Sequence, residues 1–356
     1  MCREASLRKK NRMEQLLERK RLEDLLAKIK NVKAVLIGDM CLDVYWFADM
    51  TQSVLSRETP HFPLPVVEEK MSAGAGGNAA VNMSVLCDSF TPVGIVGRDW
   101  RGVCLMDVLK KQGINTDYLV AVDDRVTNAY CKPMRRGFSA EVMEDPRLDF
   151  ESFAPLSKEA EDALLQKLNE ATKGADLLCV SDQFASGCIT PKIRERINEL
   201  AKGGLLTVVD SRSKIGLYKN CILKPNEIEC ARALGLESDA LCREKATEAD
   251  VKNAAVALSE KTESDICLTL GDRGSLVYRK GEFTPISAIK LSPPFDIVGA
   301  GDCFLSAFSL ALAAGAETAE AGKIGSLASG VCVKKLHTTG SASREEILAL
   351  YDKAAN

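Results

Sequence analysis

The sequence predicts an α/β protein: a doubly wound, mostly parallel β-sheet flanked by helices, with a small additional β-sheet. Short uninterrupted apolar runs recur along the chain, and such runs are typical of strands buried on both faces of a parallel sheet. Helical segments separate these runs, and this alternation indicates helices layered on a sheet. With 356 residues, 46% of them hydrophobic, the chain can build one large core.

The predicted elements follow this alternation. Residues 1–30 are rich in Lys, Arg, Glu and Leu, and leucines at helical spacing predict an amphipathic N-terminal helical extension to a domain spanning 31–356. Five apolar runs predict the buried strands, at 34–37, 176–180, 205–209, 221–223 and 266–270. Four helices are expected near them, at 157–173, 191–202, 227–235 and 247–261.

Two segments depart from the alternation. Residues 43–70 contain three consecutive aromatic residues and then a proline-spaced stretch, while 118–151 contain runs of alternating character. Both patterns favour extended β structure outside the central sheet. We expect them to form a small sheet that covers the site as a lid; the alternative is a pair of surface hairpins with no gating role.

Charge and composition disfavour several classes of function. A net charge of −3 offers no electrostatic attraction to nucleic acid or to an anionic membrane, and no apolar run reaches the roughly 20 residues that span a bilayer. Thirteen cysteines stand singly, without a C-x-x-C pair, so free thiols in a reducing, cytoplasmic setting are expected. With only two histidines, neither a zinc site nor a Ser-His-Asp triad is favoured.

A glycine-containing turn before an apolar helix is the most informative motif. Gly299-Ala300-Gly301 leads into this helix through Asp302. Glycines and the first turn of a helix present N–H donors that can cradle a phosphate. A carboxylate at that spot suits a base that takes a proton from an attacking hydroxyl. The motif therefore favours phosphoryl transfer to an alcohol, and the alternative is a tight turn with Asp302 as a plain helix cap.

Polar residues also follow the predicted strands. Asp39, Asp182, Asp210, Asn226 and Gly271 each lie at or just beyond the end of an apolar run. In a doubly wound sheet, ligands bind beyond the carboxyl ends of the strands. These residues are therefore expected to share a polar cleft.

From about residue 30 onward, the chain resembles the ribokinase-like (PfkB-type) sugar kinases. Residues 296–302 match the D-x-x-G-A-G-D signature of that family, and 226–229 match its N-x-x-E motif. Residues 73–80 match its glycine-rich signature, which ends in Asn and a small residue. The three motifs occur in the family's order.

The resemblance implies a kinase that uses ATP and Mg²⁺, with Asp302 as catalytic base and the N–H groups around Gly299, Ala300 and Gly301 as an anion hole. The implied sugar-binding residues are Asp39, Asp43, Gly76, Gly77 and Asn78. The implied ATP-binding residues are Lys224, Asn226, Thr269, Gly271, Gly274 and Ser326. Asn226 and Glu229 would place Mg²⁺ through water, and Asp296, with residues near 337–340, would hold a monovalent cation, K⁺.

Within the family, segments 38–46 and 147–151 are most similar to heptose-7-phosphate kinases, although Val44 stands where that group usually has arginine. The expected acceptor is therefore a sugar or sugar phosphate. A ribose-, fructose- or nucleoside-type acceptor is the alternative, and a non-catalytic sugar- or nucleotide-binding protein is a second class. Residues 74–79 also fit the dinucleotide pattern G-x-G-x-x-A. The family's lid strands lead us to expect a homodimer.

Overall fold

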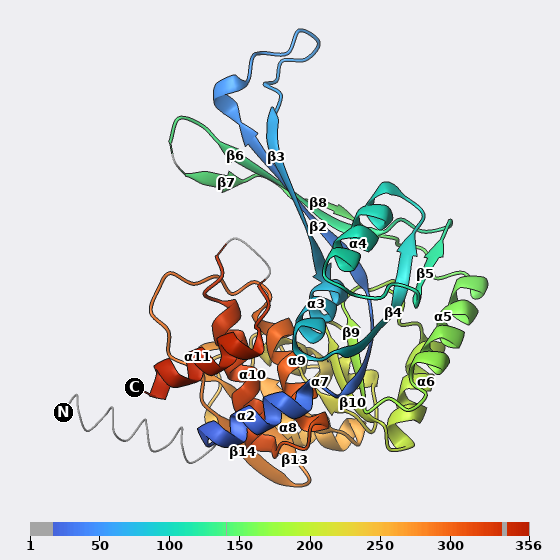
Figure 1. The fold of residues 1–356 in the computed structure, drawn as a ribbon, viewed down its shortest axis with the longest axis vertical. Helices are drawn as coiled ribbons and strands as arrows, with labels where there is room; N and C mark the ends of the chain where they lie inside the picture. The colour runs from blue at the N-terminus through green and yellow to red at the C-terminus, as the bar shows by residue number, and fades with distance from the viewer. Residues whose placement is uncertain (1–16, 140, 337–339, 356) are drawn as a thin grey trace, which may run out of the picture.

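The computed structural model describes residues 17–139, 141–336 and 340–355, and its main sheet has nine strands (Figure 1). From one edge to the other they are β14 (Glu282–Ile286), β13 (Ser275–Arg279), β12 (Asp265–Thr269), β11 (Ile222–Leu223), β10 (Leu206–Ser211), β9 (Leu177–Asp182), β1 (Lys33–Gly38), β4 (Ser89–Gly97) and β5 (Leu119–Val122). The strands from β12 to β5 pair in parallel, and only β13 and β14 are antiparallel additions. The predicted mostly parallel sheet is confirmed.

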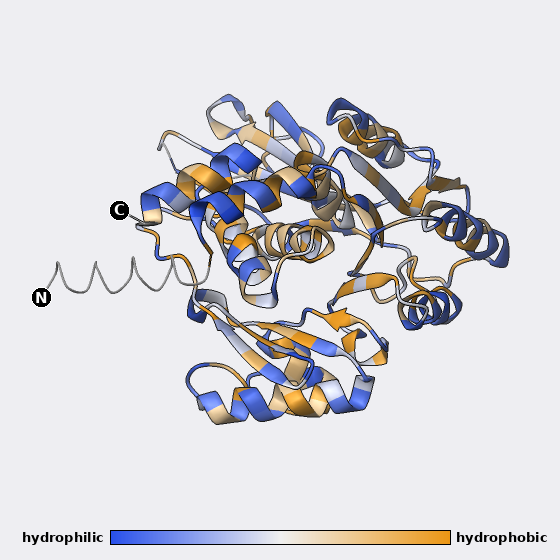
Figure 2. Ribbon diagram, turned by 60° about the horizontal axis from the view of Figure 1, so that its bottom comes forward, coloured by the Kyte–Doolittle hydropathy of each residue, from blue (hydrophilic) through white to orange (hydrophobic). Residues whose placement is uncertain are grey.

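Helices cover both faces of this sheet and give it two apolar cores. Successive residues of β1 enter different cores: Leu36 packs in one and Ile37 in the other. The first core contains residues of α2 (Arg19–Ile29), α3 (Gly76–Leu86), α4 (Trp100–Lys111), α9 (Ala300–Ala313), α10 (Thr318–Cys332) and α11 (Arg344–Ala355). The second contains residues of α5 (Lys158–Ala171), α6 (Pro191–Lys202), α7 (Glu227–Leu234) and α8 (Glu248–Thr262). Figure 2 shows the apolar inner elements surrounded by helices with hydrophilic outer faces.

Local sequence signals explain where these helices begin. The Thr190 side chain accepts a hydrogen bond from Ile193 N–H at the start of α6, and proline follows at the first helical position. Thr247 and Asp250 form a reciprocal capping box at the start of α8. These caps account for the close agreement between the expected and observed helices.

A second sheet of five strands projects from the main body (Figure 1). It consists of β2 (Met40–Asp49), β3 (Val66–Ala75), β6 (Asn128–Arg136), β7 (Val142–Glu144) and β8 (Leu148–Phe150). The expected small sheet is thus present, built from both segments that departed from the alternation. One part of that expectation was wrong: β5, inside 118–151, pairs with β4 at the edge of the main sheet.

The N-terminal helix α2 packs into the first core. Leu22, Leu25 and Leu26 are buried, as leucines at helical spacing require. Arg19 forms an ion pair with Asp352 of α11 at 2.6 Å, and Arg21 pairs with Glu320 of α10 at 2.8 Å. The N-terminal and C-terminal parts of the chain therefore lie side by side.

No helix in the described ranges is both long and apolar enough to cross a membrane. All twelve cysteines within these ranges are free, and ten of them are buried.

Candidate active site

The glycine turn begins α9 and places Asp302 in the first turn of that helix. Gly299 adopts φ +80°, a left-handed conformation that favours glycine. A Cβ added at Gly301 would meet no atom within 4 Å, so the turn borders open space. Gly301 N–H and Asp302 N–H donate to no other described residue, as expected at the start of a helix. The N–H of Ala300, by contrast, donates within the turn to Ile297 C=O at 3.2 Å, so its part in an anion hole stays a prediction.

Asp302 faces Asn78, which lies in the first turn of α3. The Asn78 amide Nδ2 donates to Asp302 Oδ2 at 2.6 Å, although 224 residues separate them. Burial, followed by the negative charge of Asp210, raises the pKa of Asp302 to about 7, while Asn78 and Lys224 act in the opposite direction. The residue is half-buried and keeps some accessible surface. Such a carboxylate can accept a proton near neutral pH.

Asp43, on β2, has an unused hydrogen-bond acceptor. Its Oδ2 lies 3.5 Å from Lys132 Nζ of β6, whereas its buried Oδ1 has no hydrogen-bond partner among the residues that the structure describes. Burial raises the pKa of Asp43, and Lys132 opposes this. Asp43 also lies close enough to Asp302 to affect its pKa. An orphaned carboxylate oxygen beside the base fits a donor supplied by a ligand, such as a sugar hydroxyl.

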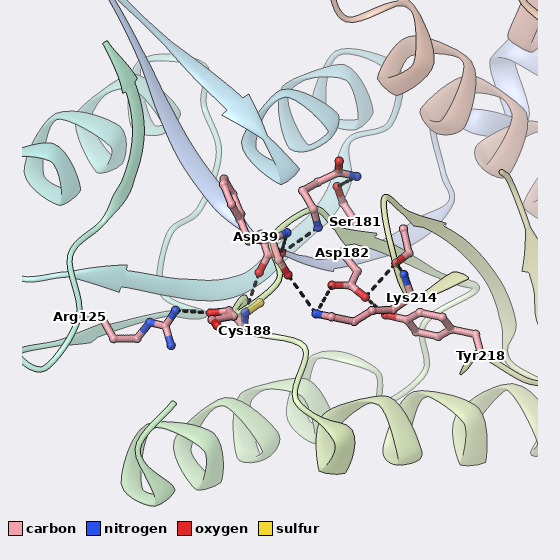
Figure 3. Close-up of polar contacts among 11 residues, drawn as sticks. Asp39, Arg125, Ser181, Asp182, Cys188, Lys214 and Tyr218 are labelled. Atoms are coloured by element: carbon pink, nitrogen blue, oxygen red, sulfur yellow. Dashed lines mark hydrogen bonds and ion pairs between the residues drawn. The ribbon is translucent and has the colours of Figure 1, made fainter. Parts of the chain in front are cut away.

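Backbone N–H groups engage the Asp39 carboxylate. This buried carboxylate accepts hydrogen bonds from Gln183 (2.8 Å), Phe184 (2.9 Å) and Cys188 (2.6 Å) (Figure 3). Both oxygens are therefore used within the loop that follows β9. Asp39 holds this loop, and its sugar-binding role stays a prediction.

Asp182, beside it in Figure 3, is similarly engaged: it pairs with Lys214 Nζ at 3.2 Å and accepts from Tyr218 O–H at 2.8 Å. The prediction that every strand-end polar residue lines the cleft was therefore too broad.

The glycines at the start of α3 are explained by backbone packing. A Cβ on Gly76 would lie 2.8 Å from Asp39 C=O, and one on Gly77 would lie 3.1 Å from Ala73 Cβ. Neither glycine needs a ligand to account for it, and their sugar-binding role stays a prediction. The dinucleotide alternative also loses support: the stretch follows β3, an antiparallel strand of the second sheet, and not the parallel strand that the fingerprint requires.

Asn226 and Glu229 form a capping box at the start of α7. Asn226 N–H donates to Glu229 Oε2, and Glu229 N–H donates to Asn226 Oδ1, both at 2.8 Å. This capping box is a structural explanation of the N-x-x-E motif, and it leaves Glu229 near enough to Lys224 and Asp210 for their charges to affect its pKa. Burial and the Asp210 charge raise the pKa of Glu229, and Lys224 opposes this.

Lys224 and Asp210 form a buried ion pair beside Asp302. Lys224 Nζ lies 3.2 Å from Asp210 Oδ1, and both residues are less than 10% exposed. Burial lowers the pKa of Lys224, but the charges of Asp210 and Glu229 outweigh burial and raise this pKa above its ordinary value. The Lys224 ammonium therefore stays charged. The charges of both residues act on Asp302 and on Glu229 in the first turn of α7.

The expected nucleotide loop adjoins this pair. Thr269, at the end of β12, donates through N–H and Oγ1 to Pro225 C=O at 2.9 and 3.2 Å, which places it beside Asn226. Gly271 has φ +58° with open space around it. Gly274 has φ +94°, and a Cβ there would lie 2.0 Å from Ile286 C=O. Gly271 is thus available to a ligand, whereas Gly274 is required by packing.

Ser326 and Asp296 are less closely tied to the site. Ser326 is buried on α10, and no hydrogen bond or ion pair links it to the other predicted ATP residues in the described ranges. Asp296 Oδ1 accepts from Val298 N–H at 3.0 Å, which shapes the approach to the glycine turn. Residues 337–339, expected near a monovalent cation, lie outside the described residues.

Two residues at this site, Tyr45 and Asn82, were not predicted from the sequence. Lys132 and Tyr45 come together across β6 and β2, with Lys132 Nζ donating to Tyr45 O–H at 2.9 Å beside Asp43. Asn82 lies one turn after Asn78 on α3 and is buried. Asn82 could have been found from the sequence as a polar residue within a mostly apolar helix. The contact between Lys132 and Tyr45 could not, because it depends on the pairing of β2 with β6.

The described residues contain no group of three or more His, Cys, Asp or Glu side chains that could by itself hold a metal ion. Asn226 and Glu229 supply an amide and a carboxylate, which suit a hard cation bound through water.

The site brings together the half-buried Asp302 carboxylate, a glycine turn at a helix start and a buried ammonium group at the carboxyl edge of a doubly wound sheet, an arrangement that suits phosphoryl transfer. Comparison with known proteins agrees: residues 33–345 match the pfkB family carbohydrate kinase model. The chain belongs to this family and is a carbohydrate kinase.

Among curated relatives, Bifunctional protein HldE of Gluconacetobacter diazotrophicus is 31% identical over 327 residues, covering 90% of this chain. Bifunctional protein HldE of Pelobacter propionicus is 27% identical over 337 residues, covering 94%. The chain spans only 63% and 66% of the length of these two relatives.

Solved structures show the same fold. Phosphofructokinase-2 from Escherichia coli in complex with substrates and products aligns with a TM-score of 0.70 at 20% identity, over 92% of this chain and 100% of that one. Arabidopsis thaliana ribokinase complexed with ribose and ATP aligns with a TM-score of 0.66 at 18% identity, over 90% of this chain and 99% of that one.

Proposed function

We propose that this chain transfers the γ-phosphoryl group of ATP to a hydroxyl of a sugar or sugar phosphate, with Asp302 as the base. The observation that carries this proposal is the Asp302 carboxylate. It is half-buried, its pKa is near 7, and the N–H groups of Gly301 and Asp302 beside it donate to no other residue in the described part of the chain. Asp43 offers an acceptor-binding oxygen on one side, and Lys224 a cation on the other.

The proposed roles follow from this arrangement. Asp43 Oδ1 accepts a hydrogen bond from the sugar and orients its hydroxyl toward Asp302. Asp302 takes the proton as the hydroxyl oxygen attacks the γ-phosphorus in line with the departing ADP oxygen. Gly301 N–H and Asp302 N–H stabilise the charge on the transferred group. Lys224, Asn226 and Glu229 hold the phosphate side, where Mg²⁺ bound through water would neutralise charge on the phosphates.

The acceptor proposed is a heptose-7-phosphate-like sugar phosphate. Two of the relatives are named Bifunctional protein HldE, and each aligns over nine-tenths or more of this chain. Lys132 and Arg147 lie near enough to Asp43 to affect its pKa, so cations accompany the acceptor side. A phosphate on the acceptor would find a favourable charge there. The likeness to ribokinase and phosphofructokinase-2 keeps ribose- and fructose-type acceptors as the second candidate.

The decisive experiment measures ADP formation from ATP and Mg²⁺ with a panel of acceptors: ribose, fructose, fructose 6-phosphate, a free heptose and its 7-phosphate. We expect the heptose 7-phosphate to give the highest kcat/KM, and Asp302→Asn to lose at least about a thousandfold in kcat while still binding ATP. If no acceptor stimulates ADP formation above the Asp302→Asn background, a non-catalytic binding protein is favoured. A folded Asp302→Asn variant that kept the wild-type kcat would show that Asp302 is not the base.

We propose further that the second sheet acts as a lid and joins two copies of the chain. Val66, Val67, Val142 and Met143 of this sheet are exposed, so an apolar surface is available for pairing. A homodimer in sedimentation experiments, lost when Val67 and Met143 are both changed to Glu, would support this. Asp296 stays the proposed ligand of K⁺, which turnover in K⁺ compared with Na⁺ tests.

A further inference from the structure

A chain of buried amide groups leads from the base into the packing between α3 and α9. Asn78 Nδ2 donates to Asp302 Oδ2 at 2.6 Å. Asn82 Nδ2 donates both to Asn78 C=O at 2.9 Å and to Asn78 Oδ1 at 3.3 Å. Cys303 Sγ donates to Asn82 Oδ1 at 2.6 Å. Asn78, Asn82 and Cys303 are all at most 3% exposed, so water does not replace these partners.

The orientation of every amide in this chain is determined by one group that cannot reverse. The Asn78 backbone C=O can only accept, so the Asn82 atom facing it must be the NH₂ group. The second N–H of that NH₂ group faces the Asn78 side chain, which must therefore present its oxygen there. The NH₂ group of Asn78 is then left on the opposite side, facing Asp302.

We propose that Asn82 is a positioning residue that fixes the orientation of the Asn78 amide, so that its NH₂ group and not its oxygen faces the catalytic Asp302. This proposal rests on the proposed role of Asp302 as base. An NH₂ donor stabilises the ionised carboxylate, which is the form that accepts a proton. When Asp302 is protonated, its O–H would need an acceptor, and Asn82 prevents Asn78 from turning its oxygen to supply one.

Removal of the Asn82 amide has a directional consequence. In Asn82→Leu, a side chain of similar shape without polar atoms, the Asn78 amide is free to rotate. Its oxygen can then accept from protonated Asp302, so the protonated form gains a hydrogen bond. The pKa of Asp302 is therefore expected to rise by about 0.5–1 unit, as for one neutral hydrogen bond.

The other charges around Asp302 stay in place in this comparison. Asp43 faces it from β2, Asp210 from the end of β10, and Lys224 from the segment after β11. The Cys303 thiol faces Asn82 and, with the Cys332 thiol, the Gly340 carbonyl. Because none of these groups is altered, a change in the acid limb reports the amide alone.

Ser306→Ala is a matched control. Ser306 Oγ donates to Ala79 C=O at 3.3 Å, a buried contact between the same two helices that does not touch the amide chain. Its loss weakens the packing of α3 on α9 without freeing Asn78. A purely structural role for Asn82 predicts that the two variants behave alike.

The test compares kcat/KM from pH 5.5 to 9.5 in the wild type, Asn82→Leu, Asn82→Ser and Ser306→Ala. The Asp302 carboxyl is also titrated by ¹³C NMR, its signal identified by loss in Asp302→Asn. We expect both Asn82 variants to move the acid limb and the NMR titration upward by 0.5–1 unit, with activity at pH 9 within about threefold of the wild type. That shift lowers relative activity at pH 6 by about threefold to tenfold.

Two outcomes overturn the inference: an unshifted NMR titration in a folded Asn82 variant, or an equal shift in Ser306→Ala. The NMR readout needs no turnover, so it separates this inference from the proposed function. Full activity in Asp302→Asn would refute the base assignment, whatever the Asn82 variants show.

Discussion

Replacement of Asp210 by Asn is expected to extend activity to lower pH. Asp210 is buried at the end of β10, and after burial its charge is the largest cause of the raised pKa of Asp302. Asn removes that charge and keeps the shape. It also leaves Lys224, which lies 3.2 Å from Asp210, without its partner. Both changes favour ionised Asp302, so its pKa must fall.

The size of the effect follows from the wild-type pKa of about 7. Below this value, kcat/KM falls tenfold per pH unit, so at pH 6 the wild type keeps about a tenth of its plateau. A carboxylate several ångströms away at an effective dielectric constant of about 20 contributes about 2 kcal/mol, which is more than one pH unit. A fall of one unit leaves about half of the plateau at pH 6. The ratio of rates at pH 6 and pH 9 should therefore rise about fivefold.

The assay quantifies ADP directly at each pH, so that no coupling enzyme contributes its own pH dependence. The ratio of rates at pH 6 and pH 9 does not depend on the plateau rate of each protein. The ionisation of ATP and of the acceptor affects the wild type and Asp210→Asn equally. Asp265→Asn is the control: this residue pairs with Arg279 at 3.1 Å at the far end of β12. An Asp210→Asn ratio that stays constant or decreases would refute the electrostatic account of Asp302.

Three further predictions concern stability and acceptor binding. Folding raises the pKa of Asp302, so the stability that the protonated carboxyl contributes is lost as pH rises through about 7. Asp302→Asn should therefore raise the free energy of unfolding at pH 8 by at most about 4 kcal/mol, and Tm with it, but should raise neither at pH 4. Burial lowers the pKa of Lys323 on α10 to about 8, so the charged form destabilises the folded protein below that pH. Lys323→Met should therefore raise the free energy of unfolding by up to about 3 kcal/mol below pH 8, and denaturant titrations should show this gain disappearing toward pH 10.5. Asp43→Asn should raise the acceptor KM by about tenfold or more and change the ATP KM little, because Asp43 Oδ1 would lose its charge-assisted hydrogen bond. Unchanged melting curves, or equal changes in both KM values, would contradict these expectations.

Much of the fold could be predicted because its determinants are local. The apolar runs that became β1, β9, β10, β11 and β12 are buried on both faces, and such runs are visible without any tertiary information. The caps of α6 and α8 mark their own helix starts. The assignment of β5 to the second sheet was wrong because its determinant is not local. A strand of four residues could pair with either sheet, and only its tertiary contact with β4 decides which one.

The site was predictable as far as its motifs carry chemistry in themselves. Asp302 after a glycine turn, and Asn226 three residues before Glu229, are recognisable from spacing alone. The contacts of Asp39, Gly76 and Gly77 could not be predicted, because they involve groups that are brought close only by folding. A carboxylate that serves a loop and one that awaits a sugar look the same in a sequence.

The sequence by itself determined the class of fold and the glycine turn that leads into Asp302, since backbone periodicity, glycine conformation and helix capping act over a few residues. Only the tertiary structure decided which groups surround the Asp302 carboxyl. The contact between Asn78 and Asp302 joins residues 224 positions apart, and the orientation of Asn78 depends on Asn82 and on Cys303 of the opposite helix. The pKa of a buried carboxyl depends on which charges and donors surround it, and those neighbours exist only once the chain has folded.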